Sequence, residues 1–290
     1  MIGGAMTNLG GEGLGLWDDR DDFYYDWLKT GTGEKTPLRV RSLVGLIPMF
    51  AVEVIDANLL KKMPVFAKRL DWYLRYRPRL ASLVSRWNAP GAEDTRLLSM
   101  ARAFRASKLM ARVLDKNEFL SDYGVRALSR YHLEQPYVFE SDGFRAEVKY
   151  VAAESDSDLF GGNSNWRGPI WMPINYLIVE SLRKYDKFFG GSMRLECPSG
   201  SGQMLSLGQI ADELRNRAIA IFRRDGKGRR PVFGSCEKMQ TDRHFKDHIL
   251  FHEYFDGDNG RGAGASHQTG WSALVANMIA ELYEPRNPTK

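Results

Sequence analysis

The strongest constraint on the fold of this chain is a succession of segments in which apolar residues recur at spacings of three and four. Such segments cover residues 41–63, 65–87, 94–114, 174–189, 207–222 and 272–283. These spacings place side chains on one face of an α-helix, so each segment predicts an amphipathic helix. Short connections separate most of the segments, which predicts a mainly α-helical fold.

Prolines and glycines predict where some of these helices bend or end. Pro48 should kink the first helix or mark its true start, because proline cannot donate the helical hydrogen bond. Pro78 should break the second helix in the same way. Gly190 and Gly191 should end the helix that covers 174–189, because glycine tolerates the left-handed conformation that closes a helix.

Two stretches depart from the helical pattern. Residues 144–152 alternate apolar and polar side chains and predict a strand, paired with 137–139 in a β-hairpin. The acidic residues around Asp18 and Asp21 favour a turn, followed by a short edge strand at 23–25. The alternative for this acidic stretch is that one of the two carboxylates faces a ligand pocket.

Composition narrows the class of protein. A chain of 290 residues with 43% hydrophobic content can bury a substantial core, as one large domain or two closely packed ones. The net charge is +5, but Lys and Arg are interleaved with Asp and Glu, and Asp and Gly interrupt the dense basic run at 223–230. This run therefore predicts a solvated turn, and we expect no nucleic-acid partner.

Cysteine usage and hydropathy predict the compartment. Cys197 and Cys236 have no metal-ligand pattern around them, so free thiols in a reducing compartment are expected, although one disulfide stays open. Neither a signal peptide nor an apolar run of about 18 residues is evident. We therefore expect a soluble cytoplasmic protein without a membrane partner.

One stretch has the composition of a carbohydrate site. Residues 163–176 contain two tryptophans, an arginine and several asparagines. Aromatic faces stack on the C–H surface of a sugar, and guanidinium and amide groups satisfy its hydroxyls. The alternative is that Trp166 and Trp171 are core residues at a junction between a loop and a helix. The loop at 117–131 could also direct polar side chains toward a ligand, namely Arg126, Ser129 and Arg130.

The remaining motifs favour carboxylate chemistry. The sequence contains neither a zinc-spaced histidine pair nor the Gly-x-Ser-x-Gly motif of serine hydrolases, and no metal or cofactor is predicted. The acidic turn at 256–260 superficially resembles a calcium loop, but the glycine and glutamate that such a loop needs are replaced. Glu253 stands between aromatic residues, where partial burial could adjust its pKa. A salt bridge or a helix cap is the alternative role for this carboxylate.

Several motifs read together resemble glycoside hydrolase family 63, in the bacterial and fungal glucosidase-like branch related to processing α-glucosidase. The motifs are Leu16-Trp-Asp-x-x-Asp-x-Phe-Tyr-Tyr-Asp26, Val40-Arg-Ser-Leu-Val-Gly-Leu-Ile-Pro48, Glu118-Phe-Leu-Ser-x-Tyr-Gly124, Ser129-Arg-Tyr-His132, Asn163-Ser-Asn-Trp-Arg-Gly-Pro-Ile-Trp171 with Asn175-Tyr176, Phe251-His-Glu-Tyr254 and His267-Gln-Thr-Gly-Trp271. The resemblance implies an (α/α)6 toroid around a sugar pocket, and an inverting mechanism with two carboxyl groups.

The resemblance also assigns roles to residues. It implies that Glu253 is the general base, and that the pocket gripping a terminal glucose is lined by Trp166, Arg167, Trp171, Asn175, Asp18, Gln268 and Trp271. The general acid of the family lies on a segment upstream of the Leu-Trp-Asp motif, without a counterpart here. We therefore expect residues 1–284 to be the C-terminal portion of the catalytic domain, an incomplete toroid with a small β-hairpin insertion, followed by a polar tail at 285–290.

Three functions follow as expectations. The first is an inverting α-glucosidase-type hydrolase acting on an oligosaccharide or glucoside, weak or inactive alone because the acid segment is missing. The second is a non-catalytic carbohydrate-binding protein. The third is a subunit that completes the barrel of an N-terminal partner segment or polypeptide, in which case an apolar face should be exposed.

Overall fold

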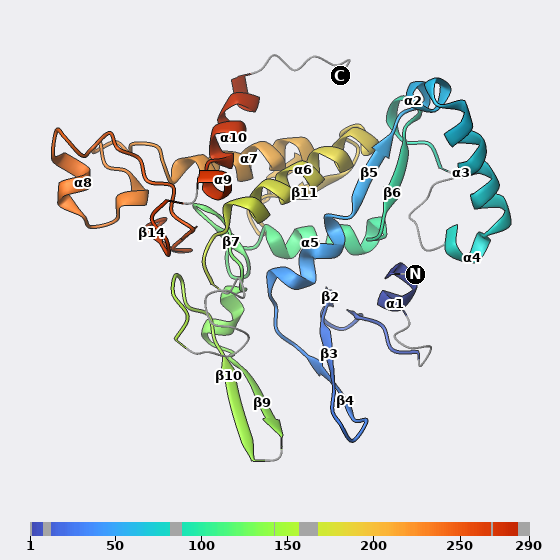
Figure 1. The fold of residues 1–290 in the computed structure, drawn as a ribbon, viewed down its shortest axis with the longest axis horizontal. Helices are drawn as coiled ribbons and strands as arrows, with labels where there is room; N and C mark the ends of the chain where they lie inside the picture. The colour runs from blue at the N-terminus through green and yellow to red at the C-terminus, as the bar shows by residue number, and fades with distance from the viewer. Residues whose placement is uncertain are drawn as a thin grey trace. The chain divides into compact units, whose positions relative to one another are not determined.

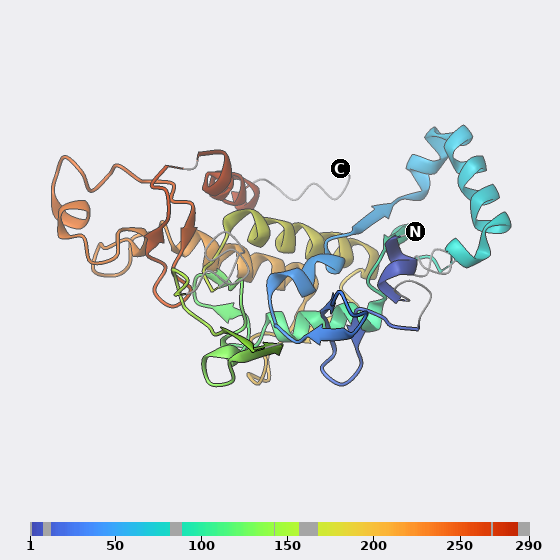
Figure 2. The same cartoon turned by 60° about the horizontal axis from the view of Figure 1, so that its bottom comes forward.

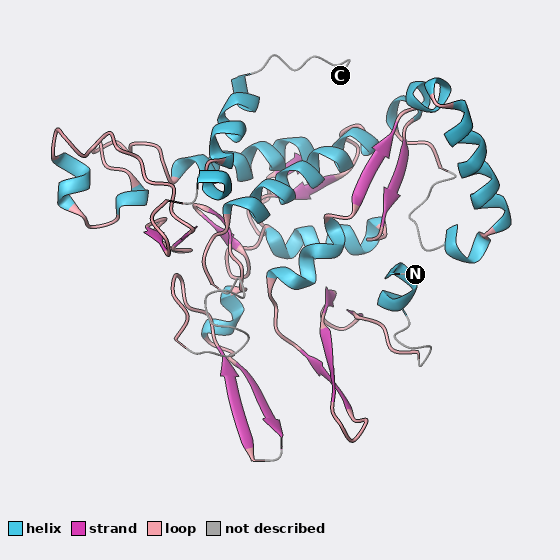
Figure 3. Ribbon diagram, viewed as in Figure 1, coloured by secondary structure: helices cyan, strands magenta, loops and turns pink. Residues whose placement is uncertain are grey.

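The computed structural model describes residues 2–7, 13–81, 89–141, 143–156, 168–267 and 269–283. The chain folds into two compact units, each made of two stretches of sequence. The first unit is formed by Met1–Leu114 with Glu180–Gly208, and the second by Asp115–Val179 with Gln209–Lys290. Helices dominate the structure, and the strands form two-stranded antiparallel pairs (Figures 1 and 3). The prediction of a mainly α-helical chain is thus confirmed.

The first unit alternates short strand pairs with helices. Its elements in order are α1 (Ile2–Thr7), β1 (Trp17–Asp18), β2 (Phe23–Tyr24), β3 (Asp26–Lys29), β4 (Lys35–Leu38), the 3-10 helix η1 (Leu43–Met49), β5 (Val52–Ile55), α2 (Ala57–Lys62), α3 (Pro64–Tyr76), α4 (Pro78–Ala81), η2 (Ala92–Asp94), β6 (Arg96–Ser99), α5 (Ala103–Val113), the second part of α6 (Met172–Phe189), β11 (Arg194–Glu196) and β12 (Met204–Ser206). The strands β5 and β6 pair with each other, so α2, α3 and α4 are an insertion between two partners.

The predicted long helix at 41–63 is wrong. Residues 43–49 form the 3-10 helix η1 with Pro48 inside it, and residues 52–55 form strand β5. Proline at position 48 prevents a regular α-helix from continuing, and the β-branched residues that follow suit a strand. The predicted helix at 94–114 is also shortened, because residues 96–99 pair with β5 and α5 begins at Ala103.

The core of the first unit explains why α5 forms. Its buried residues Ala106, Leu109, Met110 and Val113 follow the three-and-four spacing of one helix face. Tyr185 of α6 is fully buried, and its hydroxyl lies 2.7 Å from the Ser99 hydroxyl oxygen. Pro78 separates α3 from α4, as predicted, while residues 82–88 of that predicted helix lie outside the described residues.

The second unit carries the remaining elements. They are β7 (Leu120–Ser121), β8 (Gly124–Val125), η3 (Arg130–Leu133), β9 (Tyr137–Ser141), β10 (Phe144–Val148), the first part of α6, α7 (Leu207–Ala220), η5 (Pro231–Phe233), α8 (Glu237–Thr241), β13 (Tyr254–Phe255), β14 (Gly262–Ala263), α9 (Thr269–Ser272) and α10 (Leu274–Tyr283). The predicted hairpin is confirmed by five residue pairs between β9 and β10 (Figure 2).

The second unit has a continuous apolar core. Its buried members come from α6, α7, η5, β13, α10 and residues next to α6 and α7. They are Ile170, Met172, Ala218, Ile219, Ile221, Phe222, Val232, Phe233, Phe255, Val275 and Met278. The helices predicted at 174–189 and 207–222 are confirmed as α6 and α7. Gly190 and Gly191 have φ of 58° and 74°, the left-handed conformation expected at the end of α6.

The structure also bears on the state of the two cysteines and on the hydropathy of the helices. Cys197 and Cys236 are free thiols, the first buried and the second exposed. Within the described ranges, none of the helices combines the length and the hydropathy needed to cross a bilayer.

Candidate active site

Glu253 lies at the base of a hairpin in the second unit. It directly precedes β13, whose Tyr254 and Phe255 pair with Ala263 and Gly262 of β14. The Glu253 amide donates to the carbonyl oxygen of Ala265 at 2.9 Å, and the Ala265 amide donates to the Glu253 carboxylate Oε2 at 3.2 Å. In the part of the chain that the structure describes, Oε1 accepts no hydrogen bond. The backbone thus orients the carboxylate and leaves one oxygen available.

A glycine permits this close approach of backbone and carboxylate. Gly264 has φ of 68°, in the left-handed region that side-chain-bearing residues rarely adopt. A Cβ atom at this position would lie 2.8 Å from Glu253 Oε2 and 2.6 Å from the ring of Tyr254. Glycine therefore satisfies both the backbone angle and the space beside Glu253.

A short ladder joins this hairpin to two distant segments. Ile170 forms antiparallel bridges with Phe255 on one side and with Arg126 on the other. The Ile170 amide donates to the Phe255 carbonyl at 2.7 Å, and the Phe255 amide donates to the Ile170 carbonyl at 3.0 Å. Ile170 and Phe255 are fully buried. The ladder fixes the strand after Glu253 against the residue that precedes Trp171.

The tip of the hairpin is held by a buried charge. The Arg126 guanidinium donates through Nη2 to Asp258 Oδ1 at 3.0 Å and through Nε to the Tyr150 hydroxyl at 3.0 Å. The Tyr150 hydroxyl donates to the same Asp258 oxygen at 2.9 Å. Burial raises the pKa of Tyr150, so its hydroxyl stays protonated as a donor. We call Arg126, Tyr150 and Asp258 the hairpin clamp.

Three aromatic rings form a cluster that includes Tyr254, the residue after Glu253. Trp171 stacks at a tilt on Tyr254, with ring centroids 4.9 Å apart, and contacts Trp271 edge-on at 6.1 Å. Trp171 and Tyr254 are buried, at 3% and 4% exposed, while Trp271 is half-buried. The Trp171 ring therefore supports the hairpin from within the fold. Trp271 is the member of this cluster with surface open to a ligand.

Asn175 connects α6 to β8. Its Oδ1 accepts from the Val125 amide at 2.7 Å, and its Nδ2 donates to the carbonyl oxygens of Val125 at 3.1 Å and Trp171 at 3.0 Å. The residue is buried, and its amide is fully engaged by backbone. In this structure Asn175 positions strand β8 and Trp171 instead of presenting its amide to a ligand.

The remaining predicted pocket residues are Asp18, Trp166, Arg167 and Gln268. Asp18 belongs to the first unit, where its Oδ1 accepts from the amides of Arg20 and Asp21 and its Oδ2 pairs with Arg39 at 2.6 Å. This arrangement is that of a turn-capping aspartate. Trp166, Arg167 and Gln268 lie outside the described residues, so their placement in the pocket stays a prediction.

The loop at 117–131 differs from expectation. Arg126 and Ser129 are buried and do not point at a ligand, because Arg126 belongs to the hairpin clamp and the Ser129 hydroxyl donates to the Glu118 carboxylate. Arg130 is exposed. It lines a hollow of about 470 Å³ together with Asn117, Tyr131, Leu133, Glu134 and Gln135.

His252 completes the surroundings of Glu253. Its backbone carbonyl accepts from the Ser272 hydroxyl at the end of α9. Burial lowers the pKa of the imidazole, and the charge of Arg261 lowers it further. The neutral ring is therefore favoured next to Glu253. Within the described part of the chain, no group of three or more His, Cys, Asp or Glu side chains could hold a metal ion.

The local sequence does not predict the hairpin clamp, although it contains a turn signal. Asp256-Gly-Asp258-Asn-Gly260 is a turn signal, and Asp256 Oδ1 does accept from the amides of Asp258 and Asn259 at 2.8 and 3.1 Å. That signal could have predicted the hairpin on which Glu253 lies. Tyr150 and Arg126 could not be linked to it, because they are distant in sequence.

Comparison with known proteins identifies the family of this chain. Residues 97–272 match a family described as the mannosylglycerate hydrolase MGH1-like glycoside hydrolase domain. This range includes most of the second unit and all of the hairpin described above.

Individual relatives agree with that match. Uncharacterized protein YMR196W of Saccharomyces cerevisiae is 43% identical over 270 residues, which are 92% of this chain and 25% of the relative. The probable mannosyl-oligosaccharide glucosidase of Schizosaccharomyces pombe is 27% identical over 62% of this chain and 16% of its own length. Alpha-glucosidase 2 of Arabidopsis thaliana is 31% identical over 41% of this chain and 11% of its own length. The chain thus spans about a quarter of the yeast relative and less of the others.

Proposed function

The chain belongs to the family of mannosylglycerate hydrolase MGH1-like glycoside hydrolase domains, and from this premise we propose that it carries the general base of an inverting α-glucosidase-type hydrolase. Its substrate is the terminal glucose of an oligosaccharide or glucoside. The relatives named mannosyl-oligosaccharide glucosidase and alpha-glucosidase support glucose as the sugar.

The observation that carries the proposal is the carboxylate of Glu253. Its Oε2 is held by the Ala265 amide, while its Oε1 accepts no hydrogen bond from the described residues. A general base needs an oriented oxygen that can accept a proton from water as that water attacks the sugar. In this role Oε1 takes the proton, and the hairpin clamp holds the tip of the hairpin that Glu253 precedes.

An inverting reaction also needs an acid. The acid protonates the glycosidic oxygen, and its carboxyl group lies about 6.5–9.5 Å from that of the base. We propose that this acid comes from an N-terminal partner segment or polypeptide, which completes an (α/α)6 toroid to which α6, α7 and α10 belong. The chain by itself then hydrolyses natural glycosides weakly or not at all. The two free thiols, Cys197 and Cys236, support a cytoplasmic location for the protein.

A second candidate function is carbohydrate binding without catalysis. The hollow of about 470 Å³ beside η3 has the size of a small-ligand site. Tyr131 offers an aromatic face there, and Arg130, Asn117 and Gln135 offer donors that suit sugar hydroxyls. Under this alternative, Glu253→Gln leaves sugar affinity intact and Tyr131→Ala weakens it.

Substrates that differ in their need for an acid test the proposal. Fluoride leaves α-D-glucosyl fluoride readily without protonation, whereas the glucosyl leaving group of maltose requires an acid. The expected result is slow fluoride release with β-glucose as the first product, followed by proton NMR, and no hydrolysis of maltose. Glu253→Gln should lose the fluoride release.

A matched control is Glu140→Gln, which changes an exposed glutamate of β9 in the same unit. This variant should keep the native rate. Fluoride release that survives in Glu253→Gln would overturn the role of Glu253. Maltose hydrolysis that depends on Glu253 would overturn the proposal that the general acid comes from a partner segment or polypeptide. Asp18 or Asp21 would then be the acid to test.

A further inference from the structure

The insertion between β5 and β6 exposes an unusual amount of apolar surface. None of the residues of α2 or α3, both fully described, is buried. The large apolar side chains of this segment that are exposed are Leu59, Met63, Val65, Phe66, Trp72, Tyr73 and Tyr76. Figures 1 and 2 both show α3 leading away from the ends of β5 and β6. We call this segment, residues 57–81, the helical insertion.

The most exposed apolar residues of α3 lie on one face of the helix. Val65, Trp72 and Tyr76 share one face through spacings of seven and four, and they are 66%, 53% and 58% exposed. The half-buried residues Leu70 and Leu74 occupy the opposite face. An ordinary surface helix has the reverse arrangement, with its aromatic residues turned inward.

The helical insertion also concentrates positive charge. Between residues 57 and 81 the sequence has seven Lys and Arg residues and a single acidic residue, Asp71. Asp71 pairs with Arg75 at 3.4 Å, one turn away. The whole chain has a net charge of +5, so the rest of the protein is close to neutral. The expectation that basic and acidic residues are evenly interleaved is wrong for this segment.

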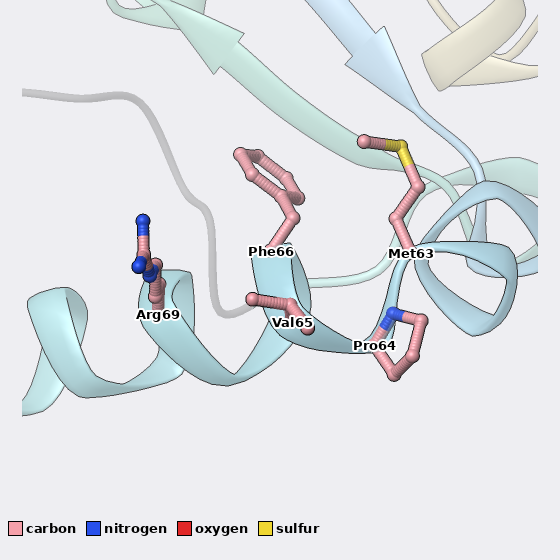
Figure 4. Close-up of a pocket in the computed structure, with 5 residues that line it drawn as sticks. All are labelled: Met63, Pro64, Val65, Phe66 and Arg69. Atoms are coloured by element: carbon pink, nitrogen blue, oxygen red, sulfur yellow. The ribbon is translucent and has the colours of Figure 1, made fainter.

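A hollow at the start of α3 combines both properties. It has a volume of about 380 Å³ and is lined by Met63, Pro64, Val65, Phe66 and Arg69. In Figure 4, Met63, Phe66 and Arg69 project on the same side of the ribbon. The hollow thus places a guanidinium beside apolar walls, which suits a ligand with an anionic group next to a hydrocarbon group.

We propose that the solvent-facing side of α3 binds the surface of an anionic phospholipid membrane. A helix that lies in the membrane interface has Trp, Tyr and Phe on one face and Lys and Arg around it. Here the aromatic rings enter the headgroup region, and Lys61, Lys62 and Lys68 contact anionic lipids from the rim. This binding is peripheral and needs no membrane-spanning helix.

The charge distribution favours a lipid surface over the other partners. Protein interfaces are depleted in lysine and usually combine both signs of charge, whereas this face is of one sign. A second copy of the chain would bring two positive faces together, and their repulsion disfavours that contact. An anionic membrane attracts every charge of the helical insertion at once.

Vesicle co-sedimentation tests the proposal with the purified full chain. One set of vesicles contains phosphatidylcholine with 30% phosphatidylserine, and the other contains phosphatidylcholine alone. The expected result is binding to the anionic vesicles at about 0.05 M salt, at least fivefold weaker at about 0.5 M salt because ions screen exposed charges. Trp72→Ala with Tyr76→Ala should weaken binding at least tenfold.

Two controls separate this face from general effects. Phe144→Ala removes an equally exposed aromatic residue from β10 and should leave binding unchanged. Reversing two charges at Lys61 and Lys62 to Glu should weaken binding at least fivefold, whereas the same reversal at the exposed Arg223 and Lys227 should have less than twofold effect. Circular dichroism verifies that each variant is folded.

Three outcomes would overturn the assignment. One is the absence of native binding to the anionic vesicles. Another is equal loss of binding in the Phe144→Ala control or in the Arg223 and Lys227 variant. The third is capture by immobilised poly-L-glutamate without binding to vesicles, which would assign the face to an acidic protein instead. None of these outcomes depends on hydrolase activity.

Discussion

Removing the carboxylate of the hairpin clamp should loosen the hairpin that carries Glu253. In the variant Asp258→Ala, the Arg126 guanidinium loses its Nη2 partner and the Tyr150 hydroxyl loses its acceptor. Arg126 is 5% exposed, so water cannot readily replace the missing carboxylate. Breaking a buried charge pair by removing one member leaves an uncompensated buried charge, which is the costly part of such a change.

The expected loss of stability in Asp258→Ala depends on how exposed Arg126 and Asp258 are. A hydrogen bond to a charged group contributes about 1.5–3 kcal/mol. The Asp258 side chain is 45% exposed, so solvent screens part of its attraction to Arg126. With that discount, Asp258→Ala should lower the local stability of the hairpin by about 2 kcal/mol. Asp258→Asn keeps an acceptor and should cost about 1 kcal/mol.

Amide hydrogen exchange with mass spectrometry measures the local stability of the hairpin. A local measurement is needed because a chain with two units need not unfold in one step. The amides of Phe255, Asp256 and Gly257 are hydrogen-bonded within or next to the hairpin. A loss of about 2 kcal/mol corresponds to exchange that is about thirtyfold faster.

The control is Asp122→Ala, which removes an acid that pairs with Arg217 at 3.1 Å but is 74% exposed. Exposed pairs contribute about 0–1 kcal/mol, so exchange at the hairpin should change less than threefold. A change below threefold in Asp258→Ala, or an equal change in the control, would refute the reasoning.

Two further predictions concern His252 and Gly264, which lie next to Glu253. Burial and Arg261 lower the pKa of His252, so its imidazole binds a proton more readily in the unfolded chain than in the folded one. The free energy of unfolding should therefore fall as the pH drops from 7 toward 5. Urea titrations at several pH values should show a weaker pH dependence in His252→Gln. Gly264→Ala should cost more than about 1 kcal/mol because of its φ of 68° and the contact with Glu253. Gly143→Ala, with φ of 79° and open space around it, should cost less in the same titration.

The sequence pattern correctly predicted helices whose apolar residues recur with helical spacing along their whole length. The helix at 174–189 has apolar residues on one face and a glycine pair after it, and the structure contains that helix as α6. The apolar residues at 52–55 are compatible with the spacing of a helix and with that of a strand. Pairing with residues 96–99, more than 40 positions away, decided in favour of the strand. Such a choice depends on tertiary contacts that a local pattern does not contain.

The site was predictable to the same limited extent. Glu253 could be singled out because aromatic residues flank it in the sequence, and the structure gives it an oriented carboxylate. The hairpin clamp could not be predicted, because Arg126 is 132 positions from Asp258 and Tyr150 is 108 positions from it. The predicted roles of Asn175 and Trp171 assumed open side chains, whereas both are buried.

The ladder of Arg126, Ile170 and Phe255 has a consequence for how the protein folds. Its two bridges join residues that are more than 40 and more than 80 positions apart. Each closure requires a long loop to lose entropy before any contact compensates for it, and chains with many such contacts fold slowly. The helices α6 and α7 can form early from local contacts, whereas the strand after Glu253 must wait for both closures. During synthesis, the surroundings of Glu253 can therefore assemble only after residue 255 has left the ribosome.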